Sequence, residues 1–99
     1  MIDLDRIVGF EWDAGNARKN EKHGVSQSEA EQVFFDRRLL MVADPSHSAD
    51  EPRYHALGTT LDRRFLHIAF TLRAEGTLIR VISARDMHRK EREIYAHED

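Results

Sequence analysis

The amino-acid sequence predicts an α+β fold, in which an antiparallel sheet carries two N-terminal helices on one face and is followed by a C-terminal helix. Apolar runs of strand length alternate with turn signals over residues 53–84, which is typical of a β-meander. Two capped segments with helical patterns precede the meander, and a charged helical segment follows it. The predicted order is β-α-α-β-β-β-β-α, with short connections that favour antiparallel neighbours.

The first strand and the first helix are predicted from the N-terminal residues. Residues 7–12 are short, apolar and aromatic, which indicates a strand. Asp13 is a candidate N-cap for a helix over about 14–23. Gly24 can supply the left-handed residue that ends this helix.

The second helix begins with a capping box. Ser26 and Glu29 match the S-x-x-E pattern, and this helix is expected to end near residue 36. Its buried face has apolar residues at i, i+3 and i+4, namely Ala30, Val33 and Phe34. An apolar run at 39–43 then predicts a strand.

Three further strands are predicted at 53–59, 64–72 and 77–84, joined by turns at 62–63 and 74–76. The strand 64–72 has one strongly apolar face and one mixed face, so we expect it at the centre of the sheet. A helix over about 86–97 is predicted to end the chain and to dock peripherally, because its apolar stripe is sparse.

Bulk composition indicates one domain over residues 1–99, of about the commonest domain size. With 40% hydrophobic and 33% charged residues, the chain should fold. The absence of cysteine excludes disulfides and thiolate zinc sites and is compatible with a reducing cytoplasm. No apolar run approaches the roughly 20 residues of a membrane span, and the first residues lack the basic start of a signal peptide. We therefore expect a cytoplasmic protein without membrane contact.

Charge is distributed unevenly along the chain, although the net charge is only −3. Residues 1–51 hold 6 Lys/Arg and 11 Asp/Glu, residues 52–92 hold 9 and 4, and residues 93–99 hold 3 acids. This asymmetry suits a protein with one surface that faces phosphates, while a solvated surface of mixed charge remains the alternative.

Two basic clusters are the candidate phosphate-binding elements. One surrounds the first helix, and the other is the strand-like run from Arg80 to Arg85. If the fold brings them together, they form a site for phosphate. Candidates for RNA contact are Trp12, Lys19, Arg64 and Arg89. The structural alternative is that Trp12 packs in the core and that the cations at the helix end complement its dipole.

Arg80 and Arg85 are separated by five residues, which places them on opposite faces of a regular strand. Arg85 lies where the predicted strand changes to a helix, and this change could alter the direction of its side chain. Ser83 and Asp86 match a capping pattern, so we interpret Ser83 as a cap rather than a nucleophile.

Proton transfer and further charge stabilisation have candidates elsewhere in the chain. Glu51 could act as general base and Arg53 as a phosphate clamp, although loop charges are commonly only solvated. Lys22 and His23 could hold a phosphate and shuttle a proton. Six histidines occur without any metal-ligand spacing, and no Gly-rich phosphate loop or Walker motif is present. We therefore expect neither a metal nor another cofactor.

The combination of motifs resembles the BrnT family of toxins over almost the whole chain. The residues that carry the resemblance are Phe10-Glu11-Trp12-Asp13, Lys22-His23-Gly24-Val25-Ser26, Ala30, Phe34, Asp44, Glu51-x-Arg53, Gly58, Arg80-Val81-Ile82-Ser83-Ala84-Arg85 and Glu91-Arg92-x-x-Tyr95. The resemblance implies a RelE-like fold and a metal-independent ribonuclease of a type II toxin–antitoxin system. It also implies neutralisation by a BrnA antitoxin, with operator DNA bound mainly through that partner.

Two positions depart from the family pattern. Many members have a lysine where this chain has Asn16, and an aromatic residue where it has Gln27. Arg18 and Lys19 could compensate for the first departure, and neither departure touches the run from Arg80 to Arg85.

The implied reaction is attack of the 2′-hydroxyl of RNA on its own phosphodiester, which needs a base, cations for the developing charge and a proton donor. We assign charge stabilisation to Arg80 and Arg85, assisted by Arg53 and Lys22, and proton transfer to Glu51 or His23. The result would be inhibition of translation and growth. The alternatives are a non-catalytic module that binds nucleic acid or protein as a co-repressor, and a structural interaction protein without a nucleic-acid role.

Overall fold

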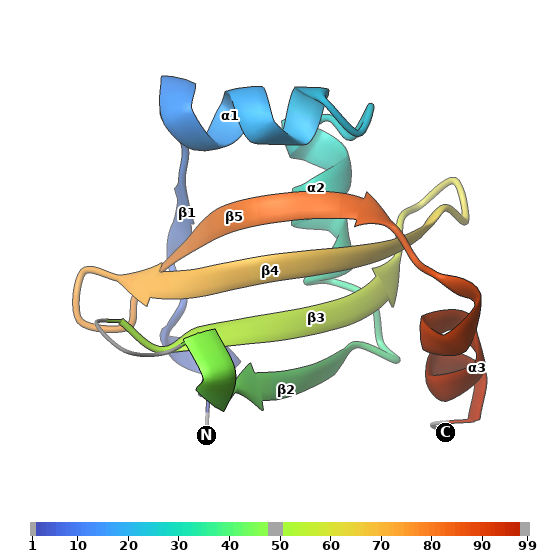
Figure 1. Ribbon diagram of the computed structural model, residues 1–99. Helices are drawn as coiled ribbons and strands as arrows, with labels where there is room; N and C mark the ends of the chain where they lie inside the picture. The colour runs from blue at the N-terminus through green and yellow to red at the C-terminus, as the bar shows by residue number, and fades with distance from the viewer. Residues whose placement is uncertain (1, 48–50, 98–99) are drawn as a thin grey trace.

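The computed structural model describes residues 2–47 and 51–97, except the side chains of Lys19, Glu21 and His47. A five-stranded sheet has the order β1-β5-β4-β3-β2, with α2 behind it, α1 above β5 and α3 beside one end (Figure 1). The elements are β1 Gly9–Glu11, α1 Ala14–Glu21, α2 Gln27–Val33, β2 Leu40–Asp44, β3 Arg53–Thr59, β4 Phe65–Arg73, β5 Leu78–Asp86 and α3 Arg89–His97, with short 3-10 turns at Leu4–Arg6 and Pro45–His47. None of the helices in these residues is long and apolar enough to cross a membrane.

The α+β class, the order of elements and the central position of β4 are confirmed. The expectation of a purely antiparallel sheet is wrong, because β1 pairs with β5 in parallel, from Gly9 beside Leu78 to Glu11 beside Arg80. After β1 the chain passes through α1 and α2 to the opposite edge, and three antiparallel steps then return it to β1. Short connections govern only the strands from β2 to β5, so they say nothing about the pairing of β1.

The predicted caps of α1 and α2 are confirmed. Asp13 accepts hydrogen bonds from the amides of Gly15 and Asn16, and Gly24 has a positive φ of 68° after α1. Ser26 and Glu29 form the reciprocal capping box that begins α2. Local sequence therefore determines where both helices start.

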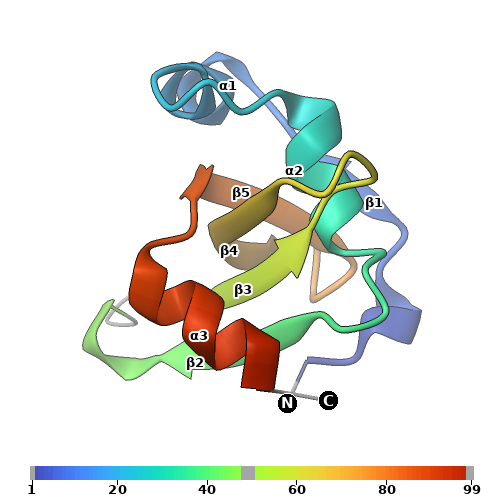
Figure 2. The ribbon, with the colours of Figure 1, turned by 90° about the vertical axis from the view of Figure 1, so that its right-hand side faces the viewer.

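The core lies between the sheet and α2. Leu66, Ile68 and Phe70 of β4 are completely buried, as are Ala30 and Val33 of α2. Figure 2 shows α2 on one side of the sheet and α3 on the other. The face of the sheet away from α2, which we call the open face, carries α3 at one end. Polar side chains of the strands also lie on this face.

The start of α3 differs from the prediction. The strand β5 continues to Asp86 and α3 begins at Arg89, so Ser83 and Asp86 do not cap it. Instead, the Glu91 carboxylate accepts a hydrogen bond from the amide of His88 at 2.8 Å. Asp86 pairs with Arg64 at 2.8 Å, which leaves it at the end of the strand. The predicted peripheral docking is confirmed, since Tyr95 packs edge-on against Phe65.

A β-bulge in β5 corrects the expectation for the two arginines. Ser83 lies opposite Ala69 and Val81 lies opposite Phe70, so Ile82 is an extra residue in β5. The bulge reverses the alternation of the strand. Arg80 and Arg85 therefore lie on the same face, opposite Thr71 and His67 of β4.

Asn16 supports this bulge from α1. Its buried Nδ2 donates to the backbone oxygens of Val81 in β5 and Glu11 in β1, both at 2.9 Å. Its Oδ1 accepts from the amide of Asp13 at 2.7 Å. One side chain thus joins α1 to two strands, which explains a buried polar residue at this position.

We expect the substitution Asn16→Ala to lower the free energy of unfolding by about 2–4 kcal/mol, because a buried and a partly buried carbonyl lose their donor. Urea unfolding followed by circular dichroism measures this change. Gln27→Ala, at an exposed position of α2, is the control and should stay close to the wild type. Unfolding of the Asn16 variant at the wild-type urea concentration would contradict the role of this side chain.

Glu91 should make stability depend on acid pH. Hydrogen bonds from Arg85 lower the pKa of Glu91 from 4.5 to about 2, despite partial burial. Stability from this carboxylate is therefore complete above about pH 4.5 and is lost as the pH falls toward 2. Glu91→Gln should be less stable than the wild type at pH 7, and the difference should disappear near pH 2 in urea titrations. The exposed Glu93→Gln on the same helix is the control, and a constant difference across this range would refute the linkage.

Candidate functional site

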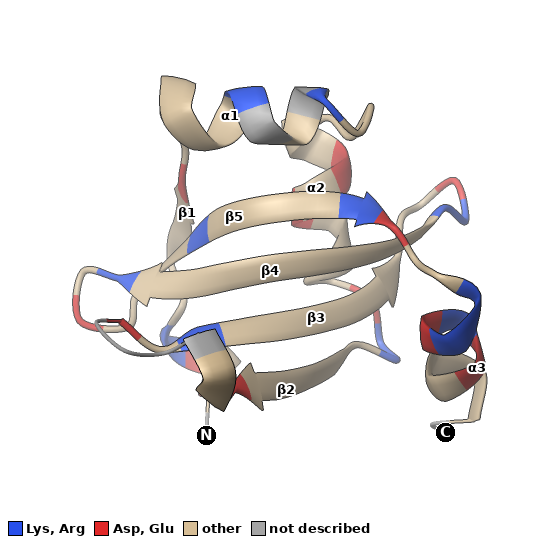
Figure 3. Cartoon of the chain, in the orientation of Figure 1, with Lys and Arg blue, Asp and Glu red and all other residues tan. Residues whose placement is uncertain are grey.

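The open face carries basic residues at the ends of neighbouring strands. Figure 3 shows Lys or Arg positions at both ends of β5, at the end of β4 and at the start of β3. These are Arg80, Arg85, Arg73 and Arg53. The pairing of β3, β4 and β5 brings them together, although they span more than thirty positions of the chain.

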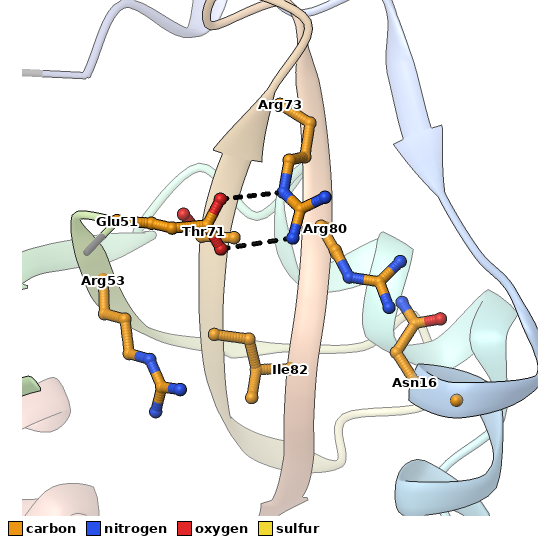
Figure 4. Close-up of a pocket in the computed structure, with 8 residues that line it drawn as sticks. Asn16, Glu51, Arg53, Thr71, Arg73, Arg80 and Ile82 are labelled. Carbon is orange, nitrogen blue, oxygen red and sulfur yellow. Dashed lines mark hydrogen bonds and ion pairs between the residues drawn. The ribbon is translucent and has the colours of Figure 1, made fainter. Parts of the chain in front are cut away.

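A cavity of about 280 Å³ lies beside Arg80, at one end of the open face (Figure 4). Three residues that the sequence proposed for catalysis line it, namely Glu51, Arg53 and Arg80. The other lining residues are Gly15, Asn16, Thr71, Arg73 and Ile82. The fold therefore places a carboxylate and three guanidinium groups around one hollow.

Carboxylates hold Arg80 in place. Arg80 donates to Glu11 at 2.8 Å and to Asp13 at 2.9 Å, and its side chain is 19% exposed. The hydrogen bond from Arg80 lowers the pKa of Asp13, and the same bond raises the pKa of Arg80. Both groups are consequently charged at neutral pH, and the guanidinium is oriented before any ligand arrives.

The segment with Glu51 and Arg53 is held against β4 by two contacts. Thr71 Oγ1 donates to the backbone oxygen of Pro52 at 2.6 Å. Arg73 contacts both carboxylate oxygens of Glu51, at 3.1 and 3.0 Å. The predicted general base therefore stands in a two-pronged ion pair.

Arg85 lies at the opposite end of β5, beside a second cavity of about 400 Å³. Its guanidinium donates to both oxygens of Glu91, at 2.8 and 2.9 Å. The cavity is lined by Leu40, Val42, His55, Leu57, His67, Arg85, Glu91 and Ile94. Two histidines thus lie beside an arginine that the sequence had placed on the other face.

Only part of the first basic cluster, the one around α1, lies near the open face. Lys22 and His23 follow α1 at exposed positions. Arg64 donates to the backbone oxygens of Gly24 and His23 and also pairs with Asp86 and Glu29. Arg64 therefore connects the end of α1 to the Arg85 end of β5, and most of its donors serve this connection.

Two of the remaining candidates for RNA contact, Trp12 and Arg89, line neither cavity. Trp12 packs against the core, and its Nε1 donates to Glu31 at 2.7 Å. Arg89 is 94% exposed on α3, with Glu93 at 3.6 Å. The side chain of Lys19 lies outside the described part of the structure.

Sequence reasoning missed several polar residues of the open face. Thr71 and His67 belong to the mixed face of β4, which the alternation of residues 64–72 had already indicated. Arg73 follows on the same face. Asp44 and His55 come beside them only through strand register, which no local motif reveals. Within residues 2–47 and 51–97, no group of three His, Cys, Asp or Glu residues is arranged to hold a metal ion.

Comparison with known proteins agrees with the resemblance seen in the motifs. A search of curated proteins found no match. Residues 12–91 match the family described as "Ribonuclease toxin, BrnT, of type II toxin-antitoxin system". The matched region contains both cavity-forming ends of β5 and both capped helices. The chain belongs to the BrnT family of ribonuclease toxins.

Proposed function

We propose that this protein is an endoribonuclease toxin that cleaves RNA without a metal ion, by attack of the 2′-hydroxyl on the adjacent phosphodiester. The observation that carries the proposal is the row of arginines on the open face of a chain from a ribonuclease family. Cleavage of RNA in this way would inhibit translation and growth.

The arginines suit the charge that develops during this reaction. Attack of the 2′-oxygen creates a phosphorane with additional negative charge, which fixed cations stabilise without reorganisation. A guanidinium has five N–H donors, and the hydrogen bonds of Arg80 to Glu11 and Asp13 use three of them. Arg80 can therefore bind a phosphate while its carboxylate partners keep it in position.

The two ends of β5 can bind different phosphates of one RNA strand. Arg80 and Arg85 lie opposite Thr71 and His67, which are four positions apart on β4, and this corresponds to about 13 Å. Arg53 and Arg73 lie at the Arg80 end. Lys22 lies on the segment that Arg64 connects to the Arg85 end, where it could assist as a cation.

We propose a BrnA-like antitoxin as the partner that neutralises this activity. An antitoxin that covers the open face would exclude RNA both sterically and electrostatically. Operator DNA would then be bound by the complex, mainly through the antitoxin. The type II family membership supports an antitoxin partner, and the basic open face is the surface we assign to it.

The proposed reaction predicts cleavage of RNA that is indifferent to EDTA and absent when the 2′-hydroxyl at the cut site is removed. Purified protein is incubated with end-labelled RNA and with its 2′-deoxy counterpart, with and without EDTA. Products with a 2′,3′-cyclic phosphate are expected. Binding of both substrates without scission of either would instead indicate a non-catalytic module, and inhibition by EDTA would contradict a metal-independent reaction.

Replacement of either arginine of β5 should weaken catalysis. We expect Arg80→Ala and Arg85→Ala each to lower kcat/KM for RNA about tenfold to a hundredfold, because each variant loses a cation that binds a phosphate of the RNA strand being cleaved. Cleavage of a defined RNA gives kcat/KM, and circular dichroism checks the fold. Arg37→Ala removes an exposed arginine from the turn after α2 and should cleave like the wild type. Equal activity of all four proteins would refute the assignment.

A further inference from the structure

We propose that Asp44, His55 and His67 form the proton-transfer chain of the ribonuclease site, with His67 as the group that meets the RNA and Arg85 as its neighbouring phosphate ligand. This inference rests on the proposed ribonuclease function and deepens it, because it names the acid–base group. It also places bond cleavage at the Arg85 end of the open face.

The three side chains come from three adjacent strands and form a continuous hydrogen-bonded row. Asp44 Oδ2 of β2 lies 2.8 Å from His55 Nε2 of β3. His55 Nδ1 lies 2.9 Å from His67 Nε2 of β4. The two rings are tilted by 36° with centroids 4.8 Å apart. Strand register places all three side chains on the open face. His55 lies opposite Val42 of β2 and Ala69 of β4. Asp44 and His67 are each two positions from these partners and therefore point to the same side of the sheet.

One atom at the end of this row lacks a partner. His67 is 8% exposed, and its buried Nδ1 makes no hydrogen bond in the structure. Buried ring nitrogens are ordinarily paired. His67 also lines the cavity that contains Arg85, so a ligand that enters this cavity and displaces the side chains covering Nδ1 can supply the missing partner.

Proton positions follow from the contacts of the row. With Asp44 as a carboxylate, His55 donates through Nε2–H, and its Nδ1 accepts from His67 Nε2–H. His67 Nδ1 then carries a lone pair and can accept a proton. The structure thus assigns His67 the tautomer of a general base.

The contacts of the row also bear on which histidine ring carries the positive charge after a proton has been accepted. Burial and the nearby Arg85 lower the pKa of His67 to about 4, so this ring does not retain a positive charge at neutral pH. His55 instead contacts the Asp44 carboxylate, with 2.8 Å between Nε2 and Oδ2. Arg85 and His88 oppose charge on His67, whereas Glu91 favours it.

The proposed step conserves all protons. The RNA 2′-hydroxyl gives its proton to His67 Nδ1, and the Nε2 proton of His67 passes to His55 Nδ1. The 2′-oxygen forms its bond to phosphorus as the bond to the 5′-oxygen breaks. Return of the protons along the same row lets His67 protonate the leaving 5′-oxygen, which yields a 2′,3′-cyclic phosphate and a 5′-hydroxyl.

Arg85 is positioned for the phosphate of this step. It lies directly opposite His67 in the sheet and lines the same cavity. Glu91 binds its guanidinium with two oxygens in the free protein, in the geometry that a phosphate would adopt. By contrast, Glu51 lies in the other cavity and pairs with Arg73, so we assign that end to binding of a flanking phosphate.

The kinetic test compares His67→Gln and His55→Gln with His97→Gln, an exposed histidine of α3. For His67→Gln we expect a fall in kcat of about a hundredfold or more. Its KM and its affinity for a 2′-deoxy RNA should stay within about twofold of the wild type. His55→Gln should also lose kcat, and His97→Gln should keep it. A His67 variant that folds and retains its kcat overturns the proton-transfer chain.

This experiment separates the two proposals. Cleavage by the wild type together with full activity of the His67 variant would leave the ribonuclease function standing and remove the row from it. Absence of cleavage by the wild type on any RNA tested would overturn both proposals.

Nitrogen-15 NMR of the histidine rings provides an independent measurement on the wild-type protein, even if His67→Gln fails to fold. At pH 7 we expect His67 to be neutral, with its proton on Nε2 and a bare Nδ1. A proton on Nδ1 would overturn the assignment of this atom as the base.

Discussion

The extra residue in β5 is the constraint on which the functional face depends. If Ile82 were paired regularly and β5 had no bulge, Arg80 and Arg85 would point to opposite sides of the sheet, and one of them would lie against the apolar core. Asn16 stabilises this irregularity because its side-chain amide binds the carbonyl of Val81 next to the bulge. Asn16, one of the two positions that depart from the expected family pattern, is therefore structural in this chain.

Electrostatics of the open face reconcile a negative net charge with a surface for phosphate. The arginines are concentrated on the strands, and carboxylates keep three of them in place, with Glu51 beside Arg73, Glu11 beside Arg80 and Glu91 beside Arg85. These pairs fix the direction of the guanidinium groups and lower the repulsion among them. The same carboxylates compete with RNA phosphates for the arginines. RNA must therefore bind the guanidinium groups more favourably than these carboxylates do.

Much of the fold could be predicted because its signals are local. Asp13 and Ser26 cap helices through residues three positions away, and alternation within residues 64–72 already placed β4 at the centre. The prediction was wrong where contacts between segments far apart in the sequence decide the structure. The parallel pairing of β1 depends on the path around the sheet, and the start of α3 depends on Arg64 and Glu91, which draw Asp86 and His88 into other bonds.

The sequence by itself determined the fold class, the caps, the meander and the presence of a basic segment, because each depends on neighbouring residues. It also carried the family motifs, which are spread in order along the chain. Only the tertiary structure decided that Arg80 shares a cavity with Glu51 and Arg53, and that His67 lies beside Arg85. Those relations depend on strand register and on one bulge, and a shift of a single residue would reverse the face of every side chain involved.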